Sequence, residues 1–210
     1  MSHHPPQKDR TSWGVRARPA AVISVAAVLL TVSGAAEAHL YGAAGAGFAE
    51  GAFHPLGGLD HLLAMVAVGL WAAQIGGRAL WLVPGSFVVM MAAGGLAAMA
   101  GAPLPAVELG IVGSLLVLGA LVALAAKARL WVGAALVGLL AVFHGHAHGT
   151  ELAEAVSPAL YALGFIATTA LLHGVGLGLG SFARAGFRLR LVRAGGAAIA
   201  ATGLILLIAL

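Results

Sequence analysis

The sequence contains no cysteine and very few charged residues. Among its 210 residues none is Cys and only 9% are Asp, Glu, Lys or Arg, whereas 61% are hydrophobic. A soluble domain carries about 25% charged residues, so this chain lacks the polar surface that a water-soluble enzyme or a disordered protein needs. The absence of Cys excludes a disulfide scaffold and thiolate chemistry. A metal site here would therefore use nitrogen and oxygen ligands.

The first 38 residues have the pattern of a secretory signal peptide. The apolar run Ala20–Val32 is only 13 residues long and is followed by the small-x-small sequence Ala36-Glu37-Ala38. Four basic residues precede this run: Lys8, Arg10, Arg16 and Arg18. A basic start, a short apolar core and such a cleavage site predict a signal peptide over residues 1–38. The alternative is an uncleaved first membrane helix, which would have to continue across Glu37.

Six apolar segments fill the remaining chain, residues 39–210, and are separated by Gly, Pro or charged residues. They are Leu59–Ile75, Ala79–Ala100, Val107–Ala126, Leu130–Phe143, Pro158–Leu179 and Ala194–Leu210. A helix that crosses a bilayer needs about 20 apolar residues. The sequence therefore predicts an all-α, polytopic membrane helix bundle with six transmembrane helices. The fourth segment reaches a spanning length only if its helix continues through His144 to Glu151.

The basic residues predict how this bundle is oriented. After residue 38 they all fall in the first, third and fifth loops between the predicted spans: Arg78, Lys127, Arg129, Arg184, Arg188, Arg190 and Arg193. Cytoplasmic loops are enriched in Lys and Arg, so we expect a bacterial inner-membrane protein with both mature termini outside. The net charge of +4 comes from residues flanking membrane spans, which makes the lipid bilayer the expected partner and gives no indication of nucleic-acid binding.

Ionisable residues are concentrated at the start of the first predicted span. The sequence there is His54-Pro-Leu-Gly-Gly-Leu-Asp60-His61. Ionisable groups inside a span are costly and mark functional sites. If one helix carries all three residues, His54 and His61 are seven residues apart and nearly eclipsed, with Asp60 beside His61.

The fourth predicted span carries a second group of ionisable residues at its end. His144, His148 and Glu151 are spaced at i, i+4 and i+7 and form one polar stripe on a helix. Neutral imidazoles and carboxylates suit nickel, cobalt, zinc or iron(II), and an i, i+4 pair can chelate. The predicted orientation places both stripes at the same depth in the outer half of the membrane. If the two helices are neighbours, we expect one divalent-metal site formed by His54, Asp60, His61, His144, His148 and Glu151. The alternative is that the motifs hold two unrelated pairs of structural histidines.

Four further residues are weaker candidates for metal contacts. Glu108 begins the third span on the outer side, where it is equally well explained as an interfacial carboxylate or as a partner that orients a ligand. His146 points away from the stripe of its own helix. His173 lies deeper in the fifth span, as an exit station or as a residue hydrogen-bonded within the bundle. His39 would become the first mature residue, whose amine and imidazole together can chelate.

The two motifs resemble those of the HupE/UreJ family of bacterial nickel permeases, which are accessory to hydrogenase or urease. The family pattern of His, five residues and Asp-His is matched by His54, Asp60 and His61. The second pattern, Phe-His-Gly-x-Ala/Val-His-Gly-x-Glu, is matched from Phe143 to Glu151, with His146 in the variable position. The resemblance implies that the motif His, Asp and Glu residues are needed for nickel movement, and it does not separate nickel from cobalt.

The resemblance thus implies secondary uptake of divalent nickel, or cobalt, for hydrogenase or urease maturation. No nucleotide-binding motif is present, and we expect neither an enzyme nor a prosthetic group. One alternative is an intramembrane zinc-type metalloenzyme in which Glu151 acts as the general base on a bound water. Another is a metal sensor or scaffold subunit without transport. The sequence does not fix the client enzyme or the oligomeric state.

Overall fold

The computed structural model describes residues 46–152, 157–183 and 186–210, all within the unit Ala36–Leu210, and each regular element in these ranges is an α-helix. The helices are α2 (Ala46–Gly57), α3 (Leu59–Ile75), α4 (Ala79–Met99), α5 (Val107–Leu124), α6 (Leu130–Leu152), α7 (Pro158–Phe182) and α8 (Gly186–Ala209). The predicted signal peptide, residues 1–38, and His39 lie outside the described residues.

Helices α4 to α8 are each long and apolar enough to cross a membrane. Helices α2 and α3 pass the same test only as a pair, and they are bent by 82° at the break between them. The described chain therefore has five candidate spans, or six if the bent pair counts as one. Large apolar side chains such as Trp81 and Trp131 are 78% and 71% exposed, as expected for helices that face lipid. The all-α membrane architecture is confirmed, and the count of six remains a prediction.

Most predicted spans begin where the structure begins its helices, at Leu59, Ala79, Val107, Leu130 and Pro158. Helix α6 continues to Leu152, so the second histidine motif is helical as expected. The last span is different, because α8 begins at Gly186, eight residues before the predicted Ala194. Three arginines that we expected in a loop, Arg188, Arg190 and Arg193, are therefore helical. Long basic side chains can extend toward water from the end of an apolar helix.

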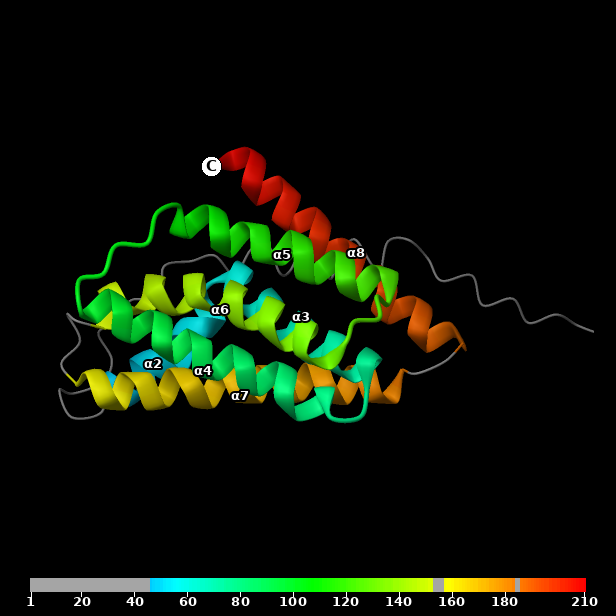
Figure 1. Ribbon diagram of the computed structural model, residues 1–210, viewed down its shortest axis with the longest axis horizontal. Coiled ribbons are helices and arrows are strands. Elements are labelled where there is room, and N and C mark those ends of the chain that lie inside the picture. Colours follow the sequence, from blue (N-terminus) through cyan, green and yellow to red (C-terminus); the bar gives the residue numbers. More distant parts are fainter. Residues whose placement is uncertain (1–45, 153–156, 184–185) are drawn as a thin grey trace, which may run out of the picture. The chain divides into compact units, whose positions relative to one another are not determined.

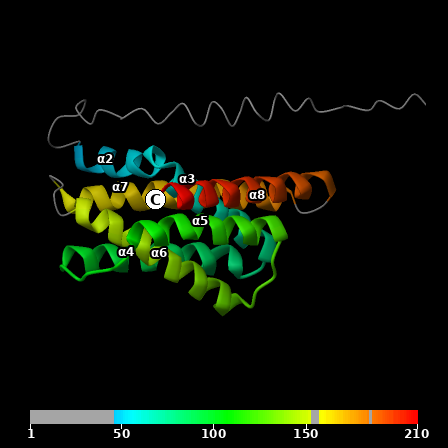
Figure 2. The same ribbon diagram turned by 90° about the horizontal axis from the view of Figure 1, so that it is seen from above.

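The helices pair side by side (Figures 1 and 2), with the most extensive contacts between α4 and α6, α5 and α8, and α3 and α7. Helix α2 lies along α7. The contact of α4 with α6 depends on the glycines of the second histidine motif. A Cβ on Gly145 would collide with the carbonyl of Met91, and one on Gly149 with the carbonyl of Gly95. Small residues at these positions let the two membrane helices approach closely.

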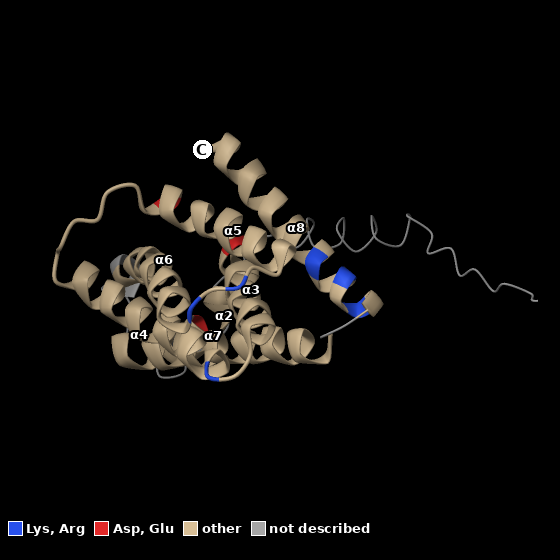
Figure 3. Cartoon of the chain, turned by 45° about the vertical axis from the view of Figure 1, so that its right-hand side comes forward, with Lys and Arg blue, Asp and Glu red and all other residues tan. Residues whose placement is uncertain are grey.

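Basic residues of the described chain lie in the α3–α4 and α5–α6 loops and in the first turns of α8 (Figure 3). Near this end, Trp71, Gln74 and Arg193 donate hydrogen bonds of 2.7–3.0 Å to backbone carbonyls in the last turn of α5 and just beyond it. The last carbonyls of a helix lack the full set of partners within the helix, so these bonds add side-chain donors there and join α3, α5 and α8. The histidine motifs lie toward the opposite ends of α3 and α6.

Candidate metal site

The first histidine motif is divided by a break in the backbone at Gly58. His54 lies in the last turn of α2, whereas Asp60 and His61 lie in the first turn of α3. The expectation that His54 and His61 are eclipsed on one helix is therefore wrong. The glycine pair at the break, Gly57 and Gly58, provides the physical reason, since glycine is the residue at which a helix most readily ends; Pro55 lies inside α2.

The break places Asp60 in the first turn of α3, where its carboxylate contacts the next residue, His61. Its Oδ1 accepts a hydrogen bond from the backbone N–H of His61 at 2.8 Å and lies 3.0 Å from the Nδ1 of the same residue. A carboxylate at a helix N-terminus is favoured by the unpaired N–H groups there. Because a carboxylate only accepts, Nδ1 of His61 carries the proton and donates it to Asp60. In a neutral ring the Nε2 of His61 then carries a lone pair. This nitrogen is buried and has no hydrogen-bond partner among the described residues.

The second histidine motif presents two buried imidazoles from one face of α6. His144 and His148 are 0% and 7% exposed. The ring centroid of His61 lies 4.8 Å from that of His144 and 4.5 Å from that of His148. The ring centroid of His54 lies 4.6 Å from that of His148. The four imidazoles therefore form a row in the order His54, His148, His61 and His144, which we call the histidine row.

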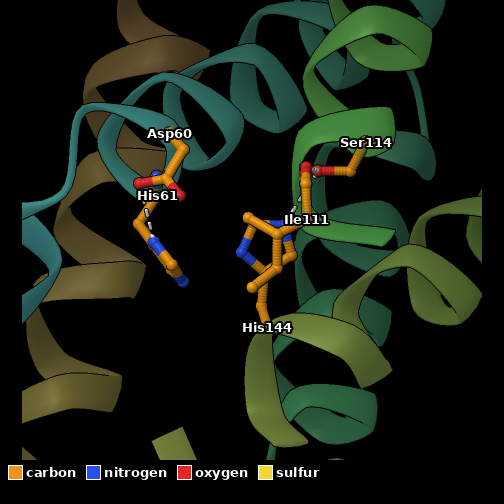
Figure 4. A network of polar contacts seen from close by, with 5 residues as sticks. All are labelled: Asp60, His61, Ile111, Ser114 and His144. Carbon is orange, nitrogen blue, oxygen red and sulfur yellow. Dashed lines mark hydrogen bonds and ion pairs between the residues drawn. The ribbon is translucent and has the colours of Figure 1, made fainter. Parts of the chain in front are cut away.

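The histidine row joins the consecutive helices α2 and α3 to α6, which is distant from them in sequence. Helices α3 and α6 are not among the closely packed pairs, so imidazole rings fill the space between them; Figure 4 shows His61 and His144 facing each other across it. The rings meet edge to face, and no three of the described His, Asp and Glu side chains are arranged as a ready metal site. Glu151 lies in the last turn of α6, and its side chain is outside the described part of the structure.

Comparison with known proteins identifies the family. A family model described as HupE / UreJ protein matches residues 26–206. The chain belongs to the HupE/UreJ family. Protein HupE of Rhizobium leguminosarum bv. viciae is 43% identical over 185 residues, which cover 87% of this chain and 96% of that protein. No solved structure matches the chain.

The weaker candidates of this HupE/UreJ chain do not join the histidine row. Glu108 is exposed in the first turn of α5, and no described contact connects it to a histidine. The ring of His146 is turned to the α4–α5 loop, where its Nε2 lies 2.9 Å from the carbonyl oxygen of Ala102. His173 is buried in α7.

Phe87 separates His173 from the histidine row and was not predicted. This fully buried residue of α4 lies with its ring centroid 5.6 Å from that of His144 and 5.1 Å from that of His173. A phenylalanine in an apolar span gives no signal in the sequence, because it is the expected residue type there. The ring lies between His144, in the histidine row, and His173.

His148 also lines an apolar cavity. This cavity has a volume of about 190 Å³ and lies between α4, α6 and α7. His148 and Tyr161 are the polar residues among those that line it. Phe165 also lines the cavity, and its ring centroid lies 4.2 Å from that of His148. The cavity therefore offers no second set of polar side chains, and the imidazoles in contact with His148 are those of His54 and His61.

Ser114 is the second residue that sequence reasoning missed. It is completely buried in α5, and its Oγ lies 2.8 Å from Nε2 of His144. A single serine inside an apolar helix is common and carries no motif of its own. Only the pairing of α5 with α6, which the sequence does not specify, brings it to the histidine.

Proposed function

We propose that this HupE/UreJ protein is a secondary permease that takes up divalent nickel, or cobalt, across the bacterial inner membrane for the maturation of hydrogenase or urease. The observation that carries the proposal is the histidine row, four contacting imidazoles between helices of a membrane bundle. Imidazole is a preferred ligand of nickel and related divalent ions.

The chemistry of the histidine row suits a transported ion better than a resident one. A closed set of four ligands holds a metal tightly, whereas conduction requires binding sites that an ion both enters and leaves. Successive imidazoles offer the ion one or two nitrogens at a time, so it exchanges ligands along the row. Magnesium prefers oxygen ligands and loses its water reluctantly, so nitrogen ligands discriminate against it.

The membrane potential supplies the driving force for uptake in this proposal. A potential of about 100 mV, negative inside, contributes roughly 2.3 kcal/mol per charge, hence about 4.6 kcal/mol for a divalent ion. Inward movement needs no ATP under these conditions. The basic loops mark the cytoplasmic side, as the distribution of Lys and Arg favours, and the histidine row then lies toward the outside.

The deeper residues of α7 extend the proposed route. His173 is 2% exposed, and neither of its ring nitrogens has a hydrogen-bond partner among the described residues. The hydroxyl of Thr169, one helical turn away, is also buried and also has no hydrogen-bond partner among the described residues. Buried polar groups are normally satisfied, so a transient cation or water is a fitting partner. We assign these residues to an inner station that receives the ion from His144 past Phe87.

The metalloenzyme alternative gains no support from the described residues. A catalytic zinc centre requires three protein ligands around one open position, and the row of edge-to-face rings does not form such a centre. The HupE/UreJ family is a transport and accessory family, which agrees with a protein that is not an enzyme.

The proposal is tested by nickel uptake in cells that carry His148→Ala or its matched control His146→Ala. Both variants remove one histidine from the same helix, but only His148 belongs to the histidine row. We expect His148→Ala to lose saturable uptake and His146→Ala to retain it within about twofold. Cobalt and zinc as competitors rank the metals. Unchanged uptake in His148→Ala would remove the histidine row from the mechanism.

A further inference from the structure

The hydroxyl of Ser114 makes two contacts, and their directions can be determined by counting protons. Its Oγ lies 2.6 Å from the carbonyl oxygen of Ile111, one turn earlier in α5, and 2.8 Å from Nε2 of His144. A carbonyl oxygen only accepts, and a hydroxyl has one proton. The proton of Ser114 is therefore donated to Ile111, and toward His144 the serine oxygen acts as an acceptor.

This direction fixes the protonation of the His144 ring. Because Ser114 accepts, Nε2 of His144 must carry a proton. A neutral imidazole has one N–H, so Nδ1 is left with a lone pair. That Nδ1 is buried and has no hydrogen-bond partner among the described residues. In Figure 4 one nitrogen of the His144 ring is turned to Ser114, and the other is on the side of His61.

His61 likewise has an acceptor at one ring nitrogen and an unpartnered second nitrogen, with the two nitrogens exchanged. Asp60 accepts from its Nδ1, which leaves Nε2 as a buried lone pair. Each of the two facing imidazoles thus donates its N–H to an acceptor, and its other nitrogen keeps a lone pair that can bind a metal ion. Histidines that bind metals almost always donate their second N–H to such a partner, which fixes the tautomer and raises the basicity of the ligand. For His61 the partner is part of the motif, whereas for His144 it comes from a distant helix.

We propose that Ser114 is a positioning residue for the transported metal ion: it holds His144 in the Nε2–H tautomer, so that the Nδ1 lone pair is available beside Nε2 of His61. The inference rests on the proposed function, because it assumes that His144 is a nickel ligand during uptake. It adds a residue outside both motifs and names the two nitrogens that bind the ion together. Ser114 itself does not touch the metal.

The first test measures the concentration dependence of nickel uptake by Ser114→Ala in the full chain reconstituted into liposomes. Loss of a partner that orients a metal-binding histidine costs about 10–100-fold in metal affinity. We therefore expect the KM for nickel to rise about tenfold or more, with a smaller change in maximal rate. Ser114→Thr, which keeps the hydroxyl, should restore most of the affinity.

The matched control for this test is Ser86→Ala. Ser86 in α4 also donates its hydroxyl proton to a carbonyl three residues earlier, that of Val83, at 2.7 Å. Within the described ranges no hydrogen bond joins Ser86 to a histidine. A general effect of removing a serine from an apolar helix would appear in both variants. Equal KM values for Ser114→Ala, Ser86→Ala and the unaltered protein would overturn the proposal.

A second measurement tests the tautomer directly and does not depend on any Ser114 variant folding. Nitrogen-15 NMR of histidine-labelled protein distinguishes a protonated ring nitrogen from one with a lone pair, and His144→Gln identifies the signal. We expect Nε2–H for His144 in the unaltered protein. An Nδ1–H tautomer would contradict the proposal. Normal uptake by His144→Gln would instead show that the proposed function does not use this residue, and so separates the two failures.

Discussion

A substitution at Gly58 tests whether the hydrogen bond between Asp60 and His61 prepares His61 to bind nickel. Its φ and ψ of −99° and 116° are open to any residue, so Gly58→Ala causes no backbone strain. The added Cβ would lie 2.7 Å from Oδ1 of Asp60 and 3.1 Å from Nδ1 of His61. Real Cβ atoms essentially never make contacts under 3.0 Å and ordinary contacts begin at 3.4 Å, so the carboxylate must move away by about 0.3–0.7 Å. We expect this shift to break its 3.0 Å bond to the imidazole.

The energy of that bond sets the size of the effect. Hydrogen bonds to charged groups contribute about 1.5–3 kcal/mol, and each 1.4 kcal/mol is about tenfold in affinity. We therefore predict that Gly58→Ala raises the KM for nickel about tenfold to a hundredfold in reconstituted liposomes. The broken bond should also lower the free energy of unfolding by up to about 1.5–3 kcal/mol, so the melting temperature of the purified variant is measured beside its uptake.

Gly57→Ala is the control for this prediction. Gly57 is the preceding residue, and a Cβ there would meet nothing within 4 Å. We expect its nickel uptake to match that of the unaltered protein. If the two alanine variants take up nickel with the same KM, the Asp60–His61 bond does not prepare a ligand and the reasoning is refuted.

Two further predictions concern stability. A Cβ on Gly145 would collide with the backbone carbonyl of Met91, so Gly145→Ala should destabilise the protein by about 1–3 kcal/mol and lower its melting temperature. A Cβ on Gly174 meets nothing within 4 Å, so Gly174→Ala should leave the melting temperature unchanged. Equal melting temperatures for the two variants would contradict the close approach of α4 and α6. Trp71→Phe removes a 2.9 Å bond to the Ala126 carbonyl and should cost about 1 kcal/mol in unfolding free energy with nickel uptake retained. A loss of uptake at unchanged stability would show that Trp71 takes part in transport.

The helical plan and the meeting of the two motifs could be predicted from the sequence. Glycine, proline and charged residues separate the apolar segments, and the spacing of His144 and His148 places both on one face. The predicted start of α8 was wrong because apolar composition marks what lies in lipid, whereas a helix continues through arginines whose side chains reach water. The turn at Gly58 was missed because periodicity alone does not show a bend.

Residues that support the candidate site were harder to predict. Ser114 and Phe87 come from helices that carry no motif, and each is an ordinary residue type in an apolar span. Their roles depend on which helix lies beside α6, and membrane helices of similar hydropathy can be paired in many ways. Asp60 was predictable because it is adjacent to His61 in the sequence. A partner from a distant helix becomes visible only in the fold.

The proposed permease moves a divalent metal inward through the histidine row without ATP. The most direct test is the uptake of radioactive nickel by liposomes that contain the full chain or its His61→Ala variant, with an imposed potential and no nucleotide. We expect saturable influx that increases as the interior is made more negative and that is lost in the variant. Nickel that binds to the protein without entering the liposomes at any potential would contradict it.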